Sequence, residues 1–274
     1  MSEIGELTLM AVHAHPDDEA ISTPGVLARY SLEGVRTVLV TCTDGALGFG
    51  PGRSNPGEPA HDPVSLAALR RAELERSCAH LGVRHLEVLG YHDSGMAGWE
   101  SNRHPDAFCN APIDEVADRL VSLIDRYRPH VLVTYDSDGG YGHPDHVQTH
   151  RVSMAALDRT EVVSKVYLTA RTQRFREGMR AARTAFTPGS DGIGGAQFMD
   201  ANDDRITTTV DTSMVVDRHR AALAAHESQL SNTHWLRMPA DIFHTLFDEE
   251  TFIRWADCTG SPVPEDDLFA GLRG

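Results

Sequence analysis

Apolar residues in the first 170 positions fall into short continuous runs separated by longer amphipathic stretches. Continuous runs are typical of strands buried on both faces, and they occupy residues 7–12, 37–42, 86–89, 130–135 and 166–168. Apolar residues at helical spacing predict helices between them, at residues 19–32, 65–81, 114–127 and 146–157. Because strands and helices alternate, we predict an α/β fold with a Rossmann-like, mostly parallel sheet and helices on both faces.

The pattern changes after residue 170. Residues 172–184 are arginine-rich with helical character, residues 206–210 resemble an added strand, and residues 215–230 read as a helix, with a glycine-rich loop predicted at 187–195. We therefore predict two parts: a Rossmann-like core over residues 1–170, and over residues 171–274 a smaller C-terminal α/β extension that completes the same domain and its pocket.

Charged and imidazole side chains follow the first predicted strand directly. Pro16 suits the first residue of a helix, which places Asp17 and Asp18 in the first helical turn, just after His15. Open α/β sheets bind ligands at this end of a strand, and these groups could hold a divalent metal and supply a general base. Taken alone, the two aspartates could equally cap the helix and complement its dipole.

A second corner of the same kind follows the strand predicted at residues 130–135. It places His143 and His146 beside another proline that can open a helix. If the two corners converge, His15, Asp18 and His146 form a two-histidine, one-carboxylate set that leaves a coordination position open for water. Zinc and iron both use such ligands, so the residues predict a metal without choosing between the two.

The overall charge and the cysteines narrow the class of protein. A formal net charge of −15 argues against nucleic acid or an anionic membrane as a partner, because both bind basic patches. The four cysteines form no C-x-x-C pair and suit reduced thiols. With an acidic N-terminal segment and no long apolar stretch, we expect a soluble, cytoplasmic protein.

The two corners together resemble the paired motifs of the zinc-dependent GlcNAc-phosphatidylinositol de-N-acetylase-like superfamily, also called PIG-L or LmbE-like. The likeness covers residues 8–160 well and includes residues 93–98 and Arg70 with Glu73; beyond that it is loose, with a late match at residues 226–229. Within the superfamily the chain is most similar to the actinobacterial mycothiol-pathway enzymes. These are the deacetylase of GlcNAc-inositol and the amidase that cleaves mycothiol S-conjugates.

The resemblance implies the same zinc ligands: His15, Asp18 and His146. Asp17 would then be the general base that takes a proton from the metal-activated water. His143 would meet the oxyanion as a cation or as a hydrogen-bond donor, and the charge of Asp145 would favour its protonated form. Tyr141 is a further donor candidate, with packing in the turn as the equal alternative.

Substrate contacts follow from the resemblance alone. Arg70 and Asp93 match the substrate-binding pair of the superfamily, and such polar side chains suit a hydroxyl-rich sugar. Without the resemblance, Arg70 would be interpreted as an exposed helix arginine. His226 and Gln229 are three residues apart on a predicted helix. Their alternative locations are the crevice and a solvated helix face, and the solvated face is expected.

These features predict a zinc-dependent amide hydrolase, with iron as the other metal. The first interpretation is an N-deacetylase of a GlcNAc-type amino-sugar substrate, which Gly142 before His143 favours. The alternatives are a mycothiol S-conjugate amidase with the same site, and a non-catalytic sugar- or nucleotide-binding module on the same fold. The expected partner is a small amino-sugar or thiol-conjugate molecule, and the oligomeric state stays open.

Overall fold

The computed structural model describes residues 6–187, 203–231 and 233–273. Within these residues, seven strands form one sheet in the order β3-β2-β1-β4-β5-β7-β6. Five neighbouring strands are parallel: β1 (Thr8–His13), β2 (Arg36–Thr43), β3 (His85–Tyr91), β4 (Val131–Thr134) and β5 (Lys165–Ala170). Two antiparallel pairings complete the sheet, of β5 with β7 (Glu249–Asp257) and of β7 with β6 (Thr208–Asp211). The predicted α/β class is confirmed.

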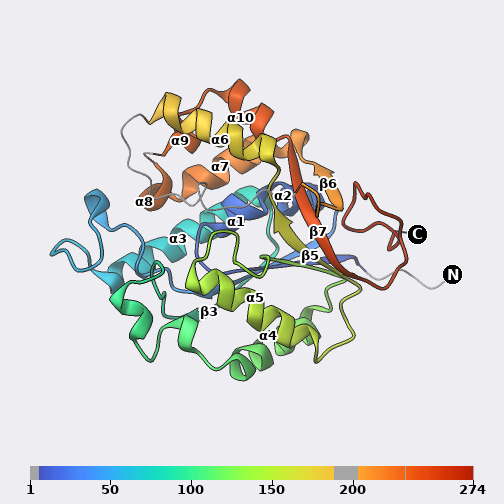
Figure 1. Ribbon diagram of the computed structural model, residues 1–274, viewed down its shortest axis with the longest axis horizontal. Coiled ribbons are helices and arrows are strands. Elements are labelled where there is room, and N and C mark those ends of the chain that lie inside the picture. The colour runs from blue at the N-terminus through green and yellow to red at the C-terminus, as the bar shows by residue number, and fades with distance from the viewer. Residues whose placement is uncertain (1–5, 188–202, 232, 274) are drawn as a thin grey trace.

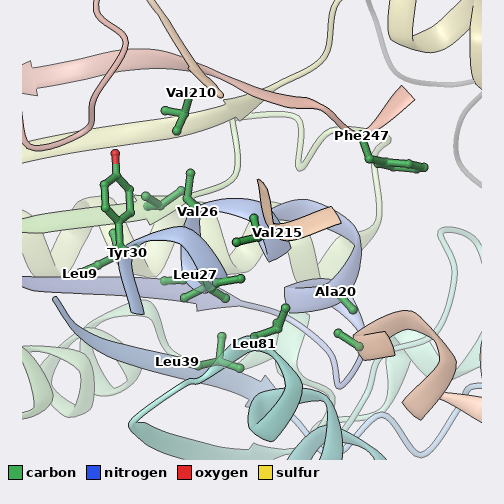
Figure 2. Packing of buried hydrophobic residues seen from close by; sticks show 14 of the residues in the cluster. Leu9, Ala20, Val26, Leu27, Tyr30, Leu39, Leu81, Val210, Val215 and Phe247 are labelled. Carbon is green, nitrogen blue, oxygen red and sulfur yellow. The ribbon is translucent and has the colours of Figure 1, made fainter. Parts of the chain in front are cut away.

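Successive residues of β1 face the two hydrophobic clusters of the core. Leu9 and Ala11 belong to one cluster and Met10 and Val12 to the other, and all four are fully buried. The alternation of side chains along a strand explains why a strand covered on both faces has a continuous apolar run. Figure 2 shows part of the first cluster, where strand residues such as Leu9 lie against helical residues.

Helices cover both faces of the sheet, as Figure 1 shows. On the face of the first cluster lie α1 (Asp18–Ser22), α2 (Pro24–Leu32), α3 (Pro63–Leu81), α6 (Gln173–Phe186), α7 (Val216–Ala225) and α10 (Ala240–Leu246). On the opposite face lie α4 (Ile113–Tyr127) and α5 (Pro144–Leu157). The connections from β2 to α3 and from β3 to α4 hold short 3-10 turns: Pro51–Arg53, Glu100–Arg103 and Phe108–Asn110. None of the described helices is both long enough and apolar enough to cross a bilayer.

Two details of the first corner differ from the prediction. The helix predicted over residues 19–32 is two helices, because Pro24 disfavours a helical conformation at Thr23, which has φ −139° and ψ 28°. Pro16 lies in the turn before α1 and is not its first residue, since α1 begins at Asp18. At the second corner the prediction is confirmed, because Pro144 opens α5 directly after its N-cap, His143.

The C-terminal part of the chain has more and shorter helices than its hydrophobic pattern predicts. The helix predicted over residues 172–184 is α6, but the one over 215–230 is interrupted at His226 between α7 and α8 (Glu227–Leu230), after a 3-10 turn at Ser213–Val215. The sequence pattern did not predict α9 (His234–Arg237), α10 or β7. Of the glycine-rich loop predicted at 187–195, residues 188–195 lie outside the described residues.

Two buried charged side chains join this late part to the rest of the molecule. Glu250 on β7 accepts hydrogen bonds from the backbone N–H groups of Gly25 (2.6 Å) and Val26 (3.0 Å) at the start of α2. Lys165 on β5 is fully buried, and its Nζ donates to three acceptors: Ser261 Oγ at 2.9 Å, Glu265 Oε1 at 2.5 Å and Ala270 O at 2.9 Å. Each buried charge is therefore satisfied.

Candidate active site

The carboxyl ends of β1 and β4 meet at the point where the strand order reverses. β1 lies between β2 and β4 in the sheet. After β1 the chain continues toward one edge of the sheet, and after β4 it continues toward the other edge. Such a point is the usual ligand crevice of an open α/β sheet. A cavity of about 680 Å³ lies here, and both His-Pro-Asp corners line it.

Three side chains from the two corners form a compact triangle. His15 Nδ1 lies 3.3 Å from Asp18 Oδ2 and 3.3 Å from His146 Nε2, and the latter lies 3.4 Å from Asp18 Oδ1. Ligand atoms about 2.0–2.1 Å from a four-coordinate zinc are about 3.3 Å from each other. The predicted ligand atoms therefore lie at the separations that a tetrahedral metal requires, and all three residues are buried.

Neighbouring groups fix the orientation of both imidazole rings. His15 Nε2 donates to Asp145 Oδ2 at 3.1 Å, and His146 Nδ1 donates to the Gly139 carbonyl at 3.1 Å. Tyr135 stacks on the ring of His146 with centroids 4.3 Å apart. Because one nitrogen of each ring is bonded in this way, the other, His15 Nδ1 or His146 Nε2, faces the triangle with its lone pair, as metal-binding histidines commonly do.

The electrostatic surroundings also favour a cation in the triangle. Burial alone would lower the pKa of His15, yet this pKa is raised well above its usual value. The groups that raise it are three buried carboxylates: Asp93, Asp145 and Asp18. A site that stabilises positive charge on an imidazole ring equally suits a metal cation, so the donor set fits a metal cofactor.

His143 lies beside the ligand triangle, against the rings of His15 and His146. Its Nδ1 accepts the backbone N–H of Asp145 at 3.2 Å, so the neutral ring carries its proton on Nε2. Burial, together with His15 and His146, lowers the pKa of His143 to about 2. Of its two predicted roles, cation or donor, only the neutral donor agrees with this environment.

Asp145 contacts a different partner from the one predicted. Its carboxylate accepts from His15 Nε2 and from both the backbone N–H (2.9 Å) and the hydroxyl of Ser94. Toward His143 it donates its backbone N–H, while an oxygen of its carboxylate lies within 4.8 Å of a nitrogen of that ring. The hydrogen-bond partners of the carboxylate are His15 and Ser94, and its support of a protonated His143 stays a prediction.

Asp17 lies in an unusual backbone conformation, with φ 130° and ψ −20°. Its side chain makes no capping bond to α1, so the capping alternative is wrong for this residue. Its Oδ2 lies 3.0 Å from Arg70 Nη2, and the residue lines the cavity. Burial raises the pKa of Asp17 to about 6 although Arg70 lowers it. A carboxylate with such a pKa can accept and return a proton near neutrality.

Arg70 and Asp93 both line the cavity, and both are buried. Arg70 donates to the carbonyls of Gly45 (2.6 Å) and Pro16 (2.5 Å), so the alternative of an exposed helix arginine is wrong. Asp93 accepts from the N–H groups of Leu47 (3.2 Å) and Gly95 (2.8 Å). These two residues thus hold the loops that form the rim, and their contact with a substrate stays a prediction.

Tyr141 lines the cavity beside the two histidines of the second corner. Its ring lies edge-on to His146, with centroids 4.9 Å apart, and 5.9 Å from the ring of His143. Burial raises the pKa of Tyr141, so its hydroxyl keeps its proton. A third His-Pro-Asp segment, at residues 104–106, is exposed and is not part of the cavity lining.

The prediction of a solvated location for His226 and Gln229 is wrong, and Gln229 lines the cavity, as the alternative had it. His226 is fully buried, and its Nε2 lies 2.5 Å from Glu19 Oε1. Gln229 accepts from the N–H of Phe49 and donates to its carbonyl, both at 2.9 Å. The helical pattern could not show these contacts, because the predicted helix is broken at His226. In the sequence, only the acidic Glu19 directly after the two aspartates indicated that a buried partner such as His226 was needed.

Comparisons with known proteins agree with the predicted resemblance. The family model described as PIG-L, GlcNAc-PI de-N-acetylase, matches residues 10–157. The 1D-myo-inositol 2-acetamido-2-deoxy-alpha-D-glucopyranoside deacetylase of Acidothermus cellulolyticus is 40% identical over 97% of this chain and 95% of its own. The enzyme of the same name from Salinispora arenicola is 39% identical over 96% and 91%.

A solved structure shows the same fold. The N,N'-diacetylchitobiose deacetylase from Pyrococcus horikoshii matches with a TM-score of 0.59 over 91% of this chain and 84% of its own, at 19% identity. The family model spans more than half of the chain, and the similarity to the A. cellulolyticus deacetylase extends over almost all of it. This chain therefore belongs to the PIG-L family of GlcNAc-PI de-N-acetylases.

Proposed function

We propose that this protein is a metal-dependent N-deacetylase that acts on GlcNAc-inositol or a closely related amino-sugar. The observation that carries the proposal is the convergence, in one cavity, of the ligand triangle, a carboxylate with a pKa near neutrality and a neutral imidazole donor. The 40% identity to a deacetylase named for GlcNAc-inositol supports the substrate. A non-catalytic binding module would not need the metal ligands, the base and the hydrogen-bond donor together.

We propose zinc as the metal, held by His15, Asp18 and His146. Two imidazole nitrogens and one carboxylate are ligands that catalytic zinc commonly takes, and iron accepts the same set. Bound there, the metal would acidify a water molecule and polarise the amide carbonyl. The buried carboxylates of Asp93 and Asp145 balance the added charge and keep the ring of His15 in place.

The remaining steps are proton transfers and hydrogen bonds made by residues of the chain. Asp17 accepts the proton of the attacking water, and its raised pKa allows it to return that proton to the leaving amine. His143 donates from Nε2 to the oxygen on which negative charge develops, with the Tyr141 hydroxyl as a second donor. Since His143 is neutral, its contribution is a hydrogen bond and not a positive charge.

Both parts of the chain form the proposed pocket. The catalytic candidates and the rim residues Arg70 and Asp93 come from residues 1–170, and part of the cavity wall comes from residues 171–274. This wall includes apolar side chains of Phe175, Met179 and Trp235. An apolar wall could accept the S-linked group of a mycothiol conjugate, which makes amidase activity the second candidate. The four unpaired cysteines suit a reducing cytoplasm as the compartment.

One comparison tests the function. Purified, zinc-loaded protein is supplied with GlcNAc-inositol and, separately, with a mycothiol S-conjugate, and the released amine is measured. We expect faster release from GlcNAc-inositol. Preference for the conjugate would make the amidase the correct assignment, and no release from either substrate or from other N-acetyl amino-sugars would exclude both.

A further inference from the structure

The backbone of Asp17 needs outside support. A φ of 130° at a residue other than glycine is rarely adopted and persists only where the surrounding structure enforces it. The side chain of Asp17 makes no bond to its own helix, and its Oδ2 lies 3.0 Å from Arg70 Nη2. The carbonyl of Asp17 accepts from the N–H groups of Ala20 (3.0 Å) and Ile21 (3.1 Å), which fixes one side of the peptide.

The other side is fixed by Glu19. Its Oε2 accepts the backbone N–H of Asp17 at 3.1 Å, while Arg70 holds the preceding carbonyl, that of Pro16. The carboxylate of Glu19 thus acts on the strained peptide from within the core, since Glu19 is fully buried. Turning this peptide would move the Asp17 side chain from its place in the cavity wall.

Glu19 depends in turn on a residue more than two hundred positions later. Its Oε1 accepts from His226 Nε2 and from the Ser77 hydroxyl, each at 2.5 Å. A buried carboxylate is costly unless it is paired, so His226, which is also fully buried, stabilises Glu19 in this place. Neither Glu19, Ser77 nor His226 is among the residues that line the cavity, so none is placed to contact a substrate there.

We propose that Glu19 and His226 are positioning residues that hold Asp17 in the conformation required of a general base. The inference rests on the proposed function, because it assigns a task to the base of that reaction. Late residues of the chain would then act on the chemistry of the first corner through a single buried hydrogen-bonded pair.

The first test separates catalysis from binding. His226→Ala leaves Glu19 without its partner, and a base displaced by a fraction of an ångström should lower kcat about 10- to 100-fold. KM for GlcNAc-inositol and the zinc content should remain near wild type. His226→Gln keeps an N–H donor and should recover most of the lost kcat. The matched control is His219→Gln, since His219 is buried on the adjoining α7 and bonds to Ala20 without contacting Glu19.

A double-mutant cycle shows whether His226 acts through Asp17. In an Asp17→Asn background the base is already lost, so adding His226→Ala should change the residual kcat less than about twofold. The same 10- to 100-fold loss in both backgrounds would overturn the inference and make the effect a general structural one. So would a His219→Gln variant as impaired as His226→Ala.

A measurement without substrate distinguishes this inference from the proposed function. Asp17→Gly relieves the φ of 130°, whereas Asp17→Ala removes the same carboxylate and keeps the strain. We expect a higher urea midpoint for the glycine variant in the wild-type background and a smaller difference in the His226→Ala background. If this holds and no N-acetyl substrate is cleaved, the proposed function fails and the positioning stands. An equal difference in both backgrounds overturns the positioning even if the enzyme is active.

Discussion

The environment of single residues decides what each group of the site can contribute. Asp17 and His143 lie in the same cavity, yet burial moves their pKa values in opposite directions, to about 6 and to about 2. Burial disfavours the charged form of both groups. Asp17 can therefore take up and release a proton near neutrality, whereas His143 stays neutral and can only donate a hydrogen bond.

This difference predicts the outcome of removing His143. His143→Ala should lower kcat about 10²- to 10³-fold, which is the usual effect of removing one hydrogen-bond donor to the oxyanion. Since the ring stays neutral above a pH of about 2, its loss should leave the shape of the pH–rate profile unchanged between pH 5 and 9. The profile of kcat/KM for both proteins checks this. A basic limb that disappears in the variant would show that the ring does titrate in this range.

Asp145 gives a second prediction at this scale. Because its carboxylate holds His15 Nε2, Asp145→Ala should weaken zinc binding about 10- to 100-fold while the three ligands remain. Competition with a chelator of known affinity measures the change. Asp138→Ala is the control, since Asp138 lines the same cavity and bonds to Gly140 without contacting a ligand. Unchanged zinc affinity in the Asp145 variant would remove its role in orienting His15.

Among the secondary-structure elements, α7 carries a histidine whose burial makes stability depend on pH. His219 donates to the carbonyl of Ala20 at 2.9 Å and packs against Phe243 and Phe247. Burial lowers the pKa of His219 to about 3. In the unfolded chain the ring takes up a proton below its ordinary pKa of 6.5, so the unfolded state binds more protons between these values, and acid destabilises the fold.

The size of this effect can be measured against a variant. At about 1.4 kcal/mol per pH unit, His219 should cost the folded state about 2 kcal/mol between pH 6.5 and 5. Between pH 7 and pH 5, urea unfolding should therefore show a loss of stability that is about 2 kcal/mol larger in the wild type than in His219→Gln. Equal pH dependence in the two proteins would mean that His219 does not titrate on unfolding.

Local patterns predicted the elements that form through local contacts or lie in the centre of the sheet. The runs at β1, β2 and β4 are buried on both faces, and the amphipathic α4 keeps its apolar face toward the core. Breaks were harder to predict. Thr23 leaves the helical conformation because Pro24 follows it, and His226 leaves it where its side chain is buried against Glu19. β7 was missed because buried polar residues, Glu250 and Thr251, interrupt its apolar pattern.

The same limit applies to the site. The sequence could predict which residues belong to the two corners, because each corner is a continuous segment. It could not predict that Asp145 turns to His15 or that His226 is buried on Glu19, since those contacts join segments far apart in the chain. The charge state of His143 also depends on such distant neighbours.

At the scale of the whole molecule, the sheet joins early and late parts of the chain into one unit. β7 and β6 extend the edge beyond β5, and the start of α2 is held by Glu250 from β7. Lys165 binds the C-terminal segment from the other end of β5. Because these long-range contacts bring the two parts of the chain together, residues from both parts line the cavity.

The burial of Lys165 has a practical consequence. It is the only lysine among 274 residues, and its amine is enclosed and engaged in three hydrogen bonds. An amine-reactive dye should therefore leave the Lys165 side chain of the folded protein unlabelled. Unfolding in strong urea should make Lys165 reactive, and the slow rate at which Lys165 is labelled without urea would report how often the C-terminal segment detaches. Mass spectrometry of labelled peptides checks this, and rapid labelling of Lys165 under native conditions would contradict it.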